Sequence, residues 1–230
     1  MKGIGFIGED LTILNTAGPD KHQAVALAVS ALEVAFYNCK FSGFQDTLYV
    51  HAGSQFFRNC IIEGTVDFIF GKGAAVFQNC LILVKQSKPG QVNVLTADGS
   101  SGMANQRGIV IHKSLIGAVP ANKIWLEDSE NSTYLGRPWS ETAATAIIRS
   151  YIGHVIHPDG WLDWDSRSEL DSIDYVEHQN FGIGSRLSKR VKWKGCRANL
   201  SEAEIQVFSI KNFLGGFWVQ ESGFPNELDT

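Results

Sequence analysis

A short motif that recurs at nearly constant spacing limits how this chain can fold. Phe-x-Asn-Cys occurs at residues 36–39, 57–60 and 77–80, so its cysteines are 21 and 20 residues apart. Looser copies of the surrounding pattern begin at Phe6 and Ile109. Each unit holds short runs of β-branched and aromatic residues separated by Gly, Asn or Asp, as several short strands per repeat require. A period of about 20 residues with this content predicts a β-solenoid, in which each turn of chain stacks on the next.

Two other architectures share parts of this pattern. A leucine-rich repeat has a similar period, but its leucine–asparagine framework is missing here. A β-sandwich also contains many short strands, yet it gives no reason for one motif to recur at one phase. Helix-period patterning is missing before residue 200, whereas Ser201 and Glu204 form a capping-box signature. We therefore predict an all-β fold, a parallel β-helix with a short C-terminal helix and loop region.

Composition and charge exclude several classes of function. The 230 residues are 44% hydrophobic and 19% charged, which suits one large soluble domain or two small ones. A net charge of -4 argues against a nucleic-acid partner, which usually selects a basic surface. No apolar run reaches the roughly 18 residues of a membrane span, so we expect no membrane partner.

The motif cysteines fall at one position on three successive turns, about 4.8 Å apart. We favour buried core thiols, since cysteine is among the residue types most often buried. A disulfide between two of them, or with the fourth cysteine, is the alternative. The chain has no Cys-x-x-Cys or Cys/His cluster, so we expect no metal. The four cysteines are Cys39, Cys60, Cys80 and Cys196.

Two aspartates share the phase of the repeat. Asp46 and Asp67 each follow the cysteine of their own repeat by seven residues, which puts both carboxylates in one column of a parallel sheet. Gln45 adjoins this column, and Gln23 precedes Gln45 by 22 residues. Two close carboxylates resist being ionised together, so the roles of acid and nucleophile separate. The alternative is that each aspartate only caps a turn.

Three later residues could complete such a site. Arg137 could pair with a carboxylate through two hydrogen bonds and keep it ionised. Trp139 and Trp161 could stack against sugar rings. On spacing alone, a surface salt bridge and two core tryptophans are the better interpretation.

Five segments together resemble the plant pectin methylesterases, and the resemblance covers essentially the whole chain. It implies a right-handed single-stranded parallel β-helix that hydrolyses galacturonate methyl esters in pectin, without a metal or organic cofactor. The segments are residues 22–27 (HQAVAL), 44–51 (FQDTLYVH), 64–71 (GTVDFIFG), 135–139 (LGRPW) and 160–164 (GWLDW).

The resemblance also implies catalytic roles. Asp67 would attack the ester carbonyl carbon as the nucleophile. Gln45, assisted by Gln23, would hydrogen-bond the oxyanion of the tetrahedral intermediate. Asp46 would protonate the departing methanol and then act as the base for the hydrolytic water. Arg137 would hold Asp67 ionised and oriented.

Substrate and surroundings follow from the same resemblance. The substrate-binding residues would be Gln23, Arg137, Trp139 and Trp161, the tryptophans lining a polysaccharide cleft. We expect methylated homogalacturonan as substrate, a proteinaceous pectinesterase inhibitor as a partner, a monomer, and a location in the extracellular cell wall. Acceptor tripeptides at Asn131 and Asn199 suit a secreted glycoprotein. The net charge predicts only weak electrostatic capture by de-esterified pectin, which is a polyanion.

The chain also departs from the family pattern. Residues 1–230 would form one catalytic domain that lacks the family's first turns and a substrate-contacting threonine, which predicts lower stability and activity. The loop after Ala97 is shorter, Ala28 replaces a commonly basic residue, and Lys72-Gly73 replaces the usual Asn-Ala. A non-catalytic pectin-binding remnant is therefore the second hypothesis. A polygalacturonase or pectate lyase would need acidic, His and Arg groupings that we do not find.

Overall fold

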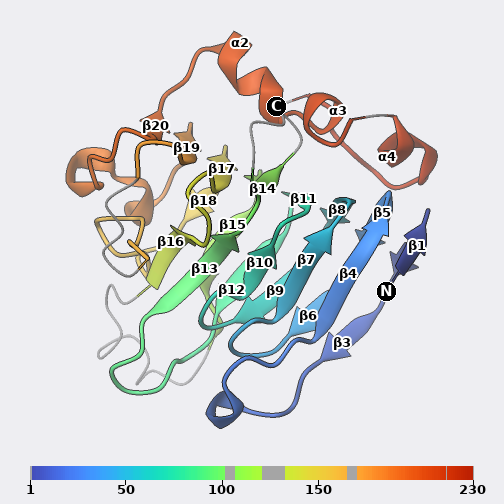
Figure 1. Cartoon of the computed structure of the whole chain (residues 1–230), viewed down its shortest axis with the longest axis horizontal. Helices are drawn as coiled ribbons and strands as arrows, with labels where there is room; N and C mark the ends of the chain where they lie inside the picture. Colours follow the sequence, from blue (N-terminus) through green and yellow to red (C-terminus); the bar gives the residue numbers. More distant parts are fainter. Residues whose placement is uncertain (1, 102–106, 121–132, 165–169, 216, 230) are drawn as a thin grey trace.

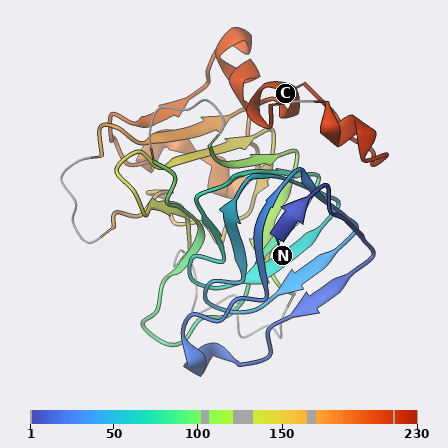
Figure 2. The ribbon, with the colours of Figure 1, turned by 45° about the vertical axis from the view of Figure 1, so that its right-hand side comes forward.

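The strands wind into one solenoid of three parallel sheets, which we name A, B and C (Figure 1). The computed structural model describes residues 2–101, 107–120, 133–164, 170–215 and 217–229. From β1 to β18, successive strands belong to sheets A, B and C in rotation, and their neighbours within each sheet run parallel. This order confirms the predicted right-handed parallel β-helix. Figure 2 brings its N-terminal turn forward.

The strands are short, as the repeat predicts. Sheet A contains β1 (Lys2–Ile4), β4 (Leu27–Leu32), β7 (Leu48–Ala52), β10 (Ile69–Gly71), β13 (Asn93–Asp98) and β16 (Thr133–Pro138). Sheet B contains β2 (Ile7–Glu9), β5 (Val34–Tyr37), β8 (Ser54–Arg58), β11 (Ala74–Gln78), β14 (Gly108–His112), β17 (Ala144–Ile148), β19 (Asp174–His178) and β20 (Cys196–Ala198). Sheet C contains β3 (Thr12–Leu14), β6 (Lys40–Ser42), β9 (Ile61–Gly64), β12 (Leu81–Val84), β15 (Leu115–Ala118) and β18 (Tyr151–Ile152).

A two-residue corner joins sheet B to sheet C in each of the first six turns. The first corner residue always has a left-handed backbone, with φ between 48° and 56°. Asn and Asp tolerate this region better than other non-glycine residues, which explains the asparagine of the motif. The six residues are Asp10, Asn38, Asn59, Asn79, Lys113 and Arg149.

The phenylalanines of the motif form a stack inside the solenoid. Phe36, Phe57 and Phe77 are fully buried. The ring centroids of Phe36 and Phe57 are 5.3 Å apart, and those of Phe57 and Phe77 are 4.6 Å apart, with nearly parallel planes. Identical positions on successive turns therefore place like side chains in contact, which ties the stability of each turn to its neighbours.

The motif cysteines point inward as free thiols, which confirms the buried-thiol prediction over the disulfide alternative; Cys196 is also free. Cys60 Sγ donates to the carbonyl of Phe36 at 3.6 Å, and Cys80 Sγ donates to that of Phe57 at 3.5 Å. Each thiol thus bonds the turn before it. Ser114 and Ser150 take the same corner position on later turns, where their hydroxyls accept from the backbone of the preceding corner.

Phe57→Ala is expected to lower the free energy of unfolding by about 3–5 kcal/mol, because it opens a cavity and removes three ring contacts, with Phe36, Phe41 and Phe77. Urea or thermal unfolding of the purified protein measures this loss. The matched control is Phe217→Ala, since Phe217 is 55% exposed and should cost about 0.5 kcal/mol or less. Equal losses of unfolding free energy in the two variants would show that the internal phenylalanine stack does not stabilise the fold more than an exposed ring does.

Short helices cover the outer face of sheet B along the top of Figure 1. Ile205 and Phe213 pack there with Phe56 and Val110 in a second apolar cluster. The predicted capping box is confirmed, because the backbone N–H of Ser201 donates to the Glu204 carboxylate at 2.9 Å and its hydroxyl accepts in return. The helices are η1 (Pro19–Lys21), η2 (Ile183–Ser185), η3 (Leu187–Lys189), α2 (Glu202–Ile205), η4 (Gln206–Phe208), α3 (Ile210–Phe213) and α4 (Trp218–Glu221).

Across the described ranges, no helix has the length and apolar character needed to cross a membrane. The acceptor tripeptide at Asn131 lies outside the described residues, whereas Asn199 is exposed.

Candidate active site

Asp46 and Asp67 lie side by side on adjacent turns, just before β7 and β10. The N–H of Asp46 donates to the carbonyl of Val66 at 3.0 Å, and the next rung joins Leu48 to Phe68 at 2.9 Å. The strand register continues this alignment and pairs Ile69 with Leu48. The predicted column of carboxylates is thus present at the backbone. Both aspartates have positive φ, 62° and 48°, a conformation that often marks functional positions.

Arg137 on β16 reaches back to hold Asp67. Its Nε lies 2.8 Å from Oδ1 and its Nη2 lies 2.5 Å from Oδ2, which is the bidentate geometry. The side chain of Asp67 is 7% exposed and that of Arg137 is 21% exposed, so this is not the surface salt bridge that spacing alone favoured. Strand register places Ala97 between Phe70 and Arg137, and its small side chain leaves room for the guanidinium.

The two carboxylates have unequal environments. Burial, together with the negative charge of Asp67, raises the pKa of Asp46 to about 7, although Arg137 partly opposes the shift. Burial also raises the pKa of Asp67, and there Arg137 opposes it through direct hydrogen bonds as well as its charge. Arg137 therefore favours ionisation of Asp67 more directly than that of Asp46, which makes the two carboxyl groups chemically unequal.

The two predicted glutamines flank this pair. The N–H of Ala24 donates to the carbonyl of Gln45 at 3.2 Å, so the segment carrying Gln23 lies on the turn before Gln45. Gln45 is half-buried and Gln23 is exposed. Within the described part of the chain, neither side-chain amide has a hydrogen-bond partner. Within the described residues, their side-chain N–H groups are therefore available to a ligand oxygen.

An aromatic row extends from the carboxylates across the outer face of sheet A. Tyr49 and Phe70 stack with ring centroids 4.5 Å apart, and Trp139 lies 6.3 Å beyond Phe70. The Nζ atom of Lys72 lies 5.3 Å from the centroid of the Trp139 ring. The sequence did not lead us to predict Tyr49 and Phe70 as site residues. Each follows its aspartate by three residues, so both occupy the same position of the repeat and could have been found by counting.

The residues directly after β13 pack against Trp139 and its neighbour Ser140. The hydroxyl of Ser140 donates to the carbonyl of Ser100 at 2.5 Å, and the Asp98 carboxylate accepts from Ser100 and from the N–H of Ala144. A side chain at Gly99 would come within 2.4 Å of the Trp139 ring. Gly99 and Ser100 are therefore packed directly behind a residue of the aromatic row.

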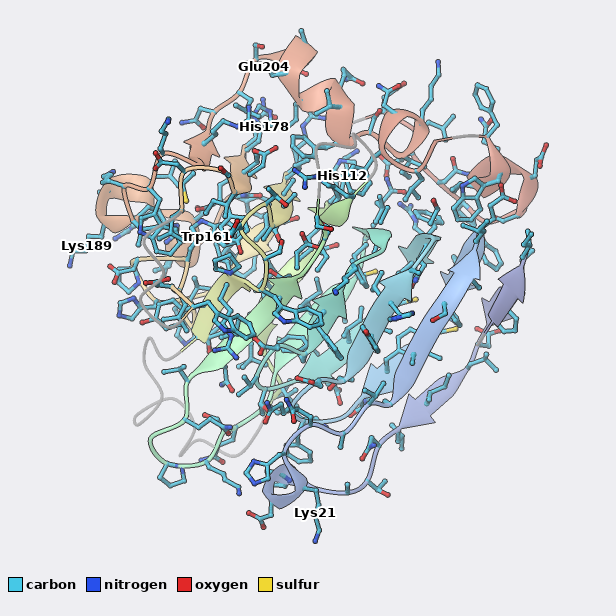
Figure 3. All side chains as sticks on the ribbon, in the orientation of Figure 1. Lys21, His112, Trp161, His178, Lys189 and Glu204 are labelled. Carbon is cyan, nitrogen blue, oxygen red and sulfur yellow. The ribbon has the colours of Figure 1, made fainter. Side chains whose placement is uncertain are left out.

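Trp161 does not lie where the sequence analysis expected. It is 2% exposed, its ring stacks on Tyr175 at 4.3 Å, and its Nε1 donates to Glu177 (Figure 3). Both faces are therefore occupied, and the predicted stacking of Trp161 on sugars is corrected to a core role. Trp164, three residues later in the same motif, instead lies over the Arg137 guanidinium at 4.0 Å. Sequence could not separate the two, because both are tryptophans in one motif.

Metal ligation has no support in the described residues, where no group of three or more His, Cys, Asp or Glu side chains is placed to hold an ion. The groups that sheet A offers are two unequal carboxyl groups, amide donors and aromatic faces. The fold and the site together define the class of protein: a right-handed parallel β-helix with a pair of carboxyl groups at the centre of a site on sheet A.

Comparison with known proteins gives the family. The family model described as Pectinesterase matches residues 1–217. Pectinesterase 3 of Citrus sinensis is 51% identical over 229 residues, which cover 98% of this chain. The chain therefore belongs to the pectinesterase family. It spans 38% of the length of the Citrus protein.

Solved structures agree with this family and fold. The pectin methylesterase from carrot superposes with a TM-score of 0.93 at 44% identity, covering 100% of this chain and 72% of the carrot chain. A pectin methylesterase in complex with a hexasaccharide superposes with a TM-score of 0.75 at 26% identity, covering 93% of this chain and 70% of the other.

Proposed function

We propose that this chain hydrolyses methyl esters of galacturonate units in pectin, with Asp67 as nucleophile and Asp46 as acid and base. The observation that carries the proposal is the asymmetric pair, in which Arg137 is hydrogen-bonded to Asp67 while burial raises the pKa of Asp46. Family membership supports the choice of ester and polymer.

In the first half-reaction, a carboxylate oxygen of Asp67 attacks the ester carbonyl carbon. The carbonyl electron pair moves onto its oxygen, which the amide N–H groups of Gln45 and Gln23 stabilise. Collapse of this intermediate breaks the bond to the methoxy oxygen, and that oxygen takes the proton of Asp46 and leaves as methanol. The product is an acyl-enzyme on Asp67.

In the second half-reaction, the ionised Asp46 removes a proton from water as the water oxygen attacks the acyl carbon. Collapse of the second intermediate breaks the bond to Asp67, which departs as a carboxylate stabilised by Arg137. The product is a galacturonic acid unit, which ionises in water, and Asp46 is again protonated.

The proposed substrate is methylated homogalacturonan, and the complex of the related methylesterase with a hexasaccharide supports a chain-like ligand. Tyr49, Phe70 and Trp139 would contact its sugar rings, and Trp164 would take the role first given to Trp161. We further propose that residues 1–230 act as one monomeric catalytic domain that modifies the plant cell wall, with a pectinesterase inhibitor protein as a partner.

Methanol release tests the proposal. The purified chain is incubated with highly methylated pectin, and methanol is measured against time, with fully de-esterified pectin as the blank. Steady release supports the esterase. Binding to pectin without release would favour the alternative of a non-catalytic pectin-binding protein.

The activity should depend on pH through Asp46. Because acylation needs protonated Asp46 and ionised Asp67, kcat/KM is expected to fall as pH rises through about 7, approaching tenfold per pH unit above it. Initial rates from pH 5 to 9 give the profile, and thermal melts at each pH check that the protein stays folded. A kcat/KM that is flat or rising across pH 7 would contradict the assignment of Asp46 as the acid.

A further inference from the structure

The charges of this chain are strongly segregated along the sequence. Residues 178–201 contain six Lys or Arg and no Asp or Glu. The whole chain has 20 basic and 24 acidic residues, so the rest of it holds 14 basic and 24 acidic residues, a net charge of -10. A protein that is acidic overall therefore carries one strongly basic segment, which includes β20, the last strand of sheet B.

A cavity of about 210 Å³ lies between this segment and the loop that follows β18. Its apolar lining comes from Ile156, Pro158 and Ile183. Its polar lining comes from His154, Arg186, Ser188, Lys189 and Arg190. Cations beside apolar side chains suit a ligand with a carboxylate and a C–H face, which is the chemistry of a uronic acid ring.

Three of the six cations of the basic segment are already paired with carboxylates. Arg190 is buried against Glu177, with Nε at 2.8 Å and Nη2 at 2.9 Å, and the exposed Lys194 and Arg197 pair with aspartates. Arg186 and Lys189 are exposed and form no ion pair within the described residues (Figure 3 labels Lys189 at the edge of the molecule). These two side chains give the cavity its net positive charge.

One segment of chain separates this cavity from the proposed active site. Residues 156–164 supply Trp164, which lies over Arg137, and also Pro158, whose carbonyl accepts from Arg190 at 3.0 Å. The backbone of Val191 donates to Asp159 at 3.1 Å on the same side. The same segment therefore lines the cavity through Ile156 and Pro158 and contacts Arg137 through Trp164.

We propose that the cavity lined by Arg186 and Lys189 is an accessory site for demethylated galacturonate units. The assignment to galacturonate rests on the proposed function, which produces one carboxylate for each ester hydrolysed. A methylated unit is neutral and gains little from these cations, whereas a demethylated unit gains a charge-assisted hydrogen bond. The site would hold the product end of a partly de-esterified chain near the sites of further hydrolysis.

The test compares two variants of equal net charge in an Asp67→Asn background, so that no ligand is consumed. Arg186→Gln/Lys189→Gln and Lys211→Glu each lower the net charge by two, and exposed Lys211 lies in α3, on the helices that cover sheet B. The probe is a de-esterified galacturonate decamer, titrated calorimetrically at low salt. The double variant is expected to weaken binding at least tenfold, and Lys211→Glu less than twofold.

Equal weakening in both variants, or none in the double variant, would overturn the proposal. Equally tight binding of a fully methylated decamer would also overturn it. Polyglutamate tests whether any polyanion suffices. If polyglutamate binds as tightly as the decamer, and the double variant weakens both equally, the site is not specific for galacturonate and the proposal is overturned. Methanol release by the unchanged Asp67 protein is measured separately. Its absence would refute the proposed esterase while leaving the binding comparison readable.

Discussion

Asp67→Asn is expected to abolish methanol release, with kcat lower by at least about 10⁴-fold. Asparagine keeps the size of the side chain and one oxygen for Arg137, but its amide cannot attack the ester carbonyl. The carboxylate of Asp67 is the one that Arg137 holds with two hydrogen bonds, so no other described group can replace it at that position. Methanol assays with an excess of protein measure the residual rate.

The control must separate lost chemistry from lost folding. Removing the charge of Asp67 leaves the Arg137 guanidinium without its negative partner, so some stability will be lost. Circular dichroism with thermal melts must therefore show a folded variant. Asp174→Asn is the matched substitution, because Asp174 forms an exposed ion pair with Arg197 and should retain full activity. Normal turnover by a folded Asp67→Asn protein would remove Asp67 from the mechanism.

Gln45→Ala is expected to lower kcat by about 10²–10³-fold with little change in KM, as for the loss of one oxyanion donor. The reason is that its amide would bond an oxygen that carries full charge only after attack begins, so its contribution is larger in the transition state than in the bound substrate. Steady-state kinetics on methylated pectin separates the two constants.

Gln23→Ala should show the same kind of effect but a smaller one, because Gln23 is exposed and its hydrogen bond competes with water. Gln179→Ala, on a distant corner, is the matched control. A raised KM with unchanged kcat in Gln45→Ala would make Gln45 a substrate-binding residue and leave the oxyanion without its main proposed donor.

The fold and the alignment of the two aspartates could be predicted from the spacing of the repeat, because that spacing reflects how the backbone stacks. In a parallel solenoid, residues at one phase must stack, so the alignment of Asp46 with Asp67 followed from counting residues. The same count would have found Tyr49 and Phe70. Arg137 could not be paired with Asp67 in this way, since its turn is separated from theirs by insertions of unequal length.

The sequence analysis found only a loose copy of the repeat at Ile109 and none around Arg149, for a chemical reason. On later turns the corner asparagine becomes Lys113 or Arg149, and the inward cysteine becomes Ser114 or Ser150. The backbone conformation and the inward hydrogen bond persist, although the residue types that reveal them do not. The prediction for Trp161 was wrong for a different reason. The sequence shows two neighbouring tryptophans, Trp161 and Trp164, but not which of them is buried in the core.

The constant two-residue corner between sheets B and C has a consequence for how the sequence of such a protein can diverge. Spacing between corners varies from 20 to 36 residues among Asp10, Asn38, Asn59, Asn79, Lys113 and Arg149, and the added length falls in the connections next to sheet A. Those connections border the aspartate pair. Segments there can be exchanged between relatives, lengthened or shortened to select different polymers, while the unchanged corners keep Asp46 and Asp67 aligned.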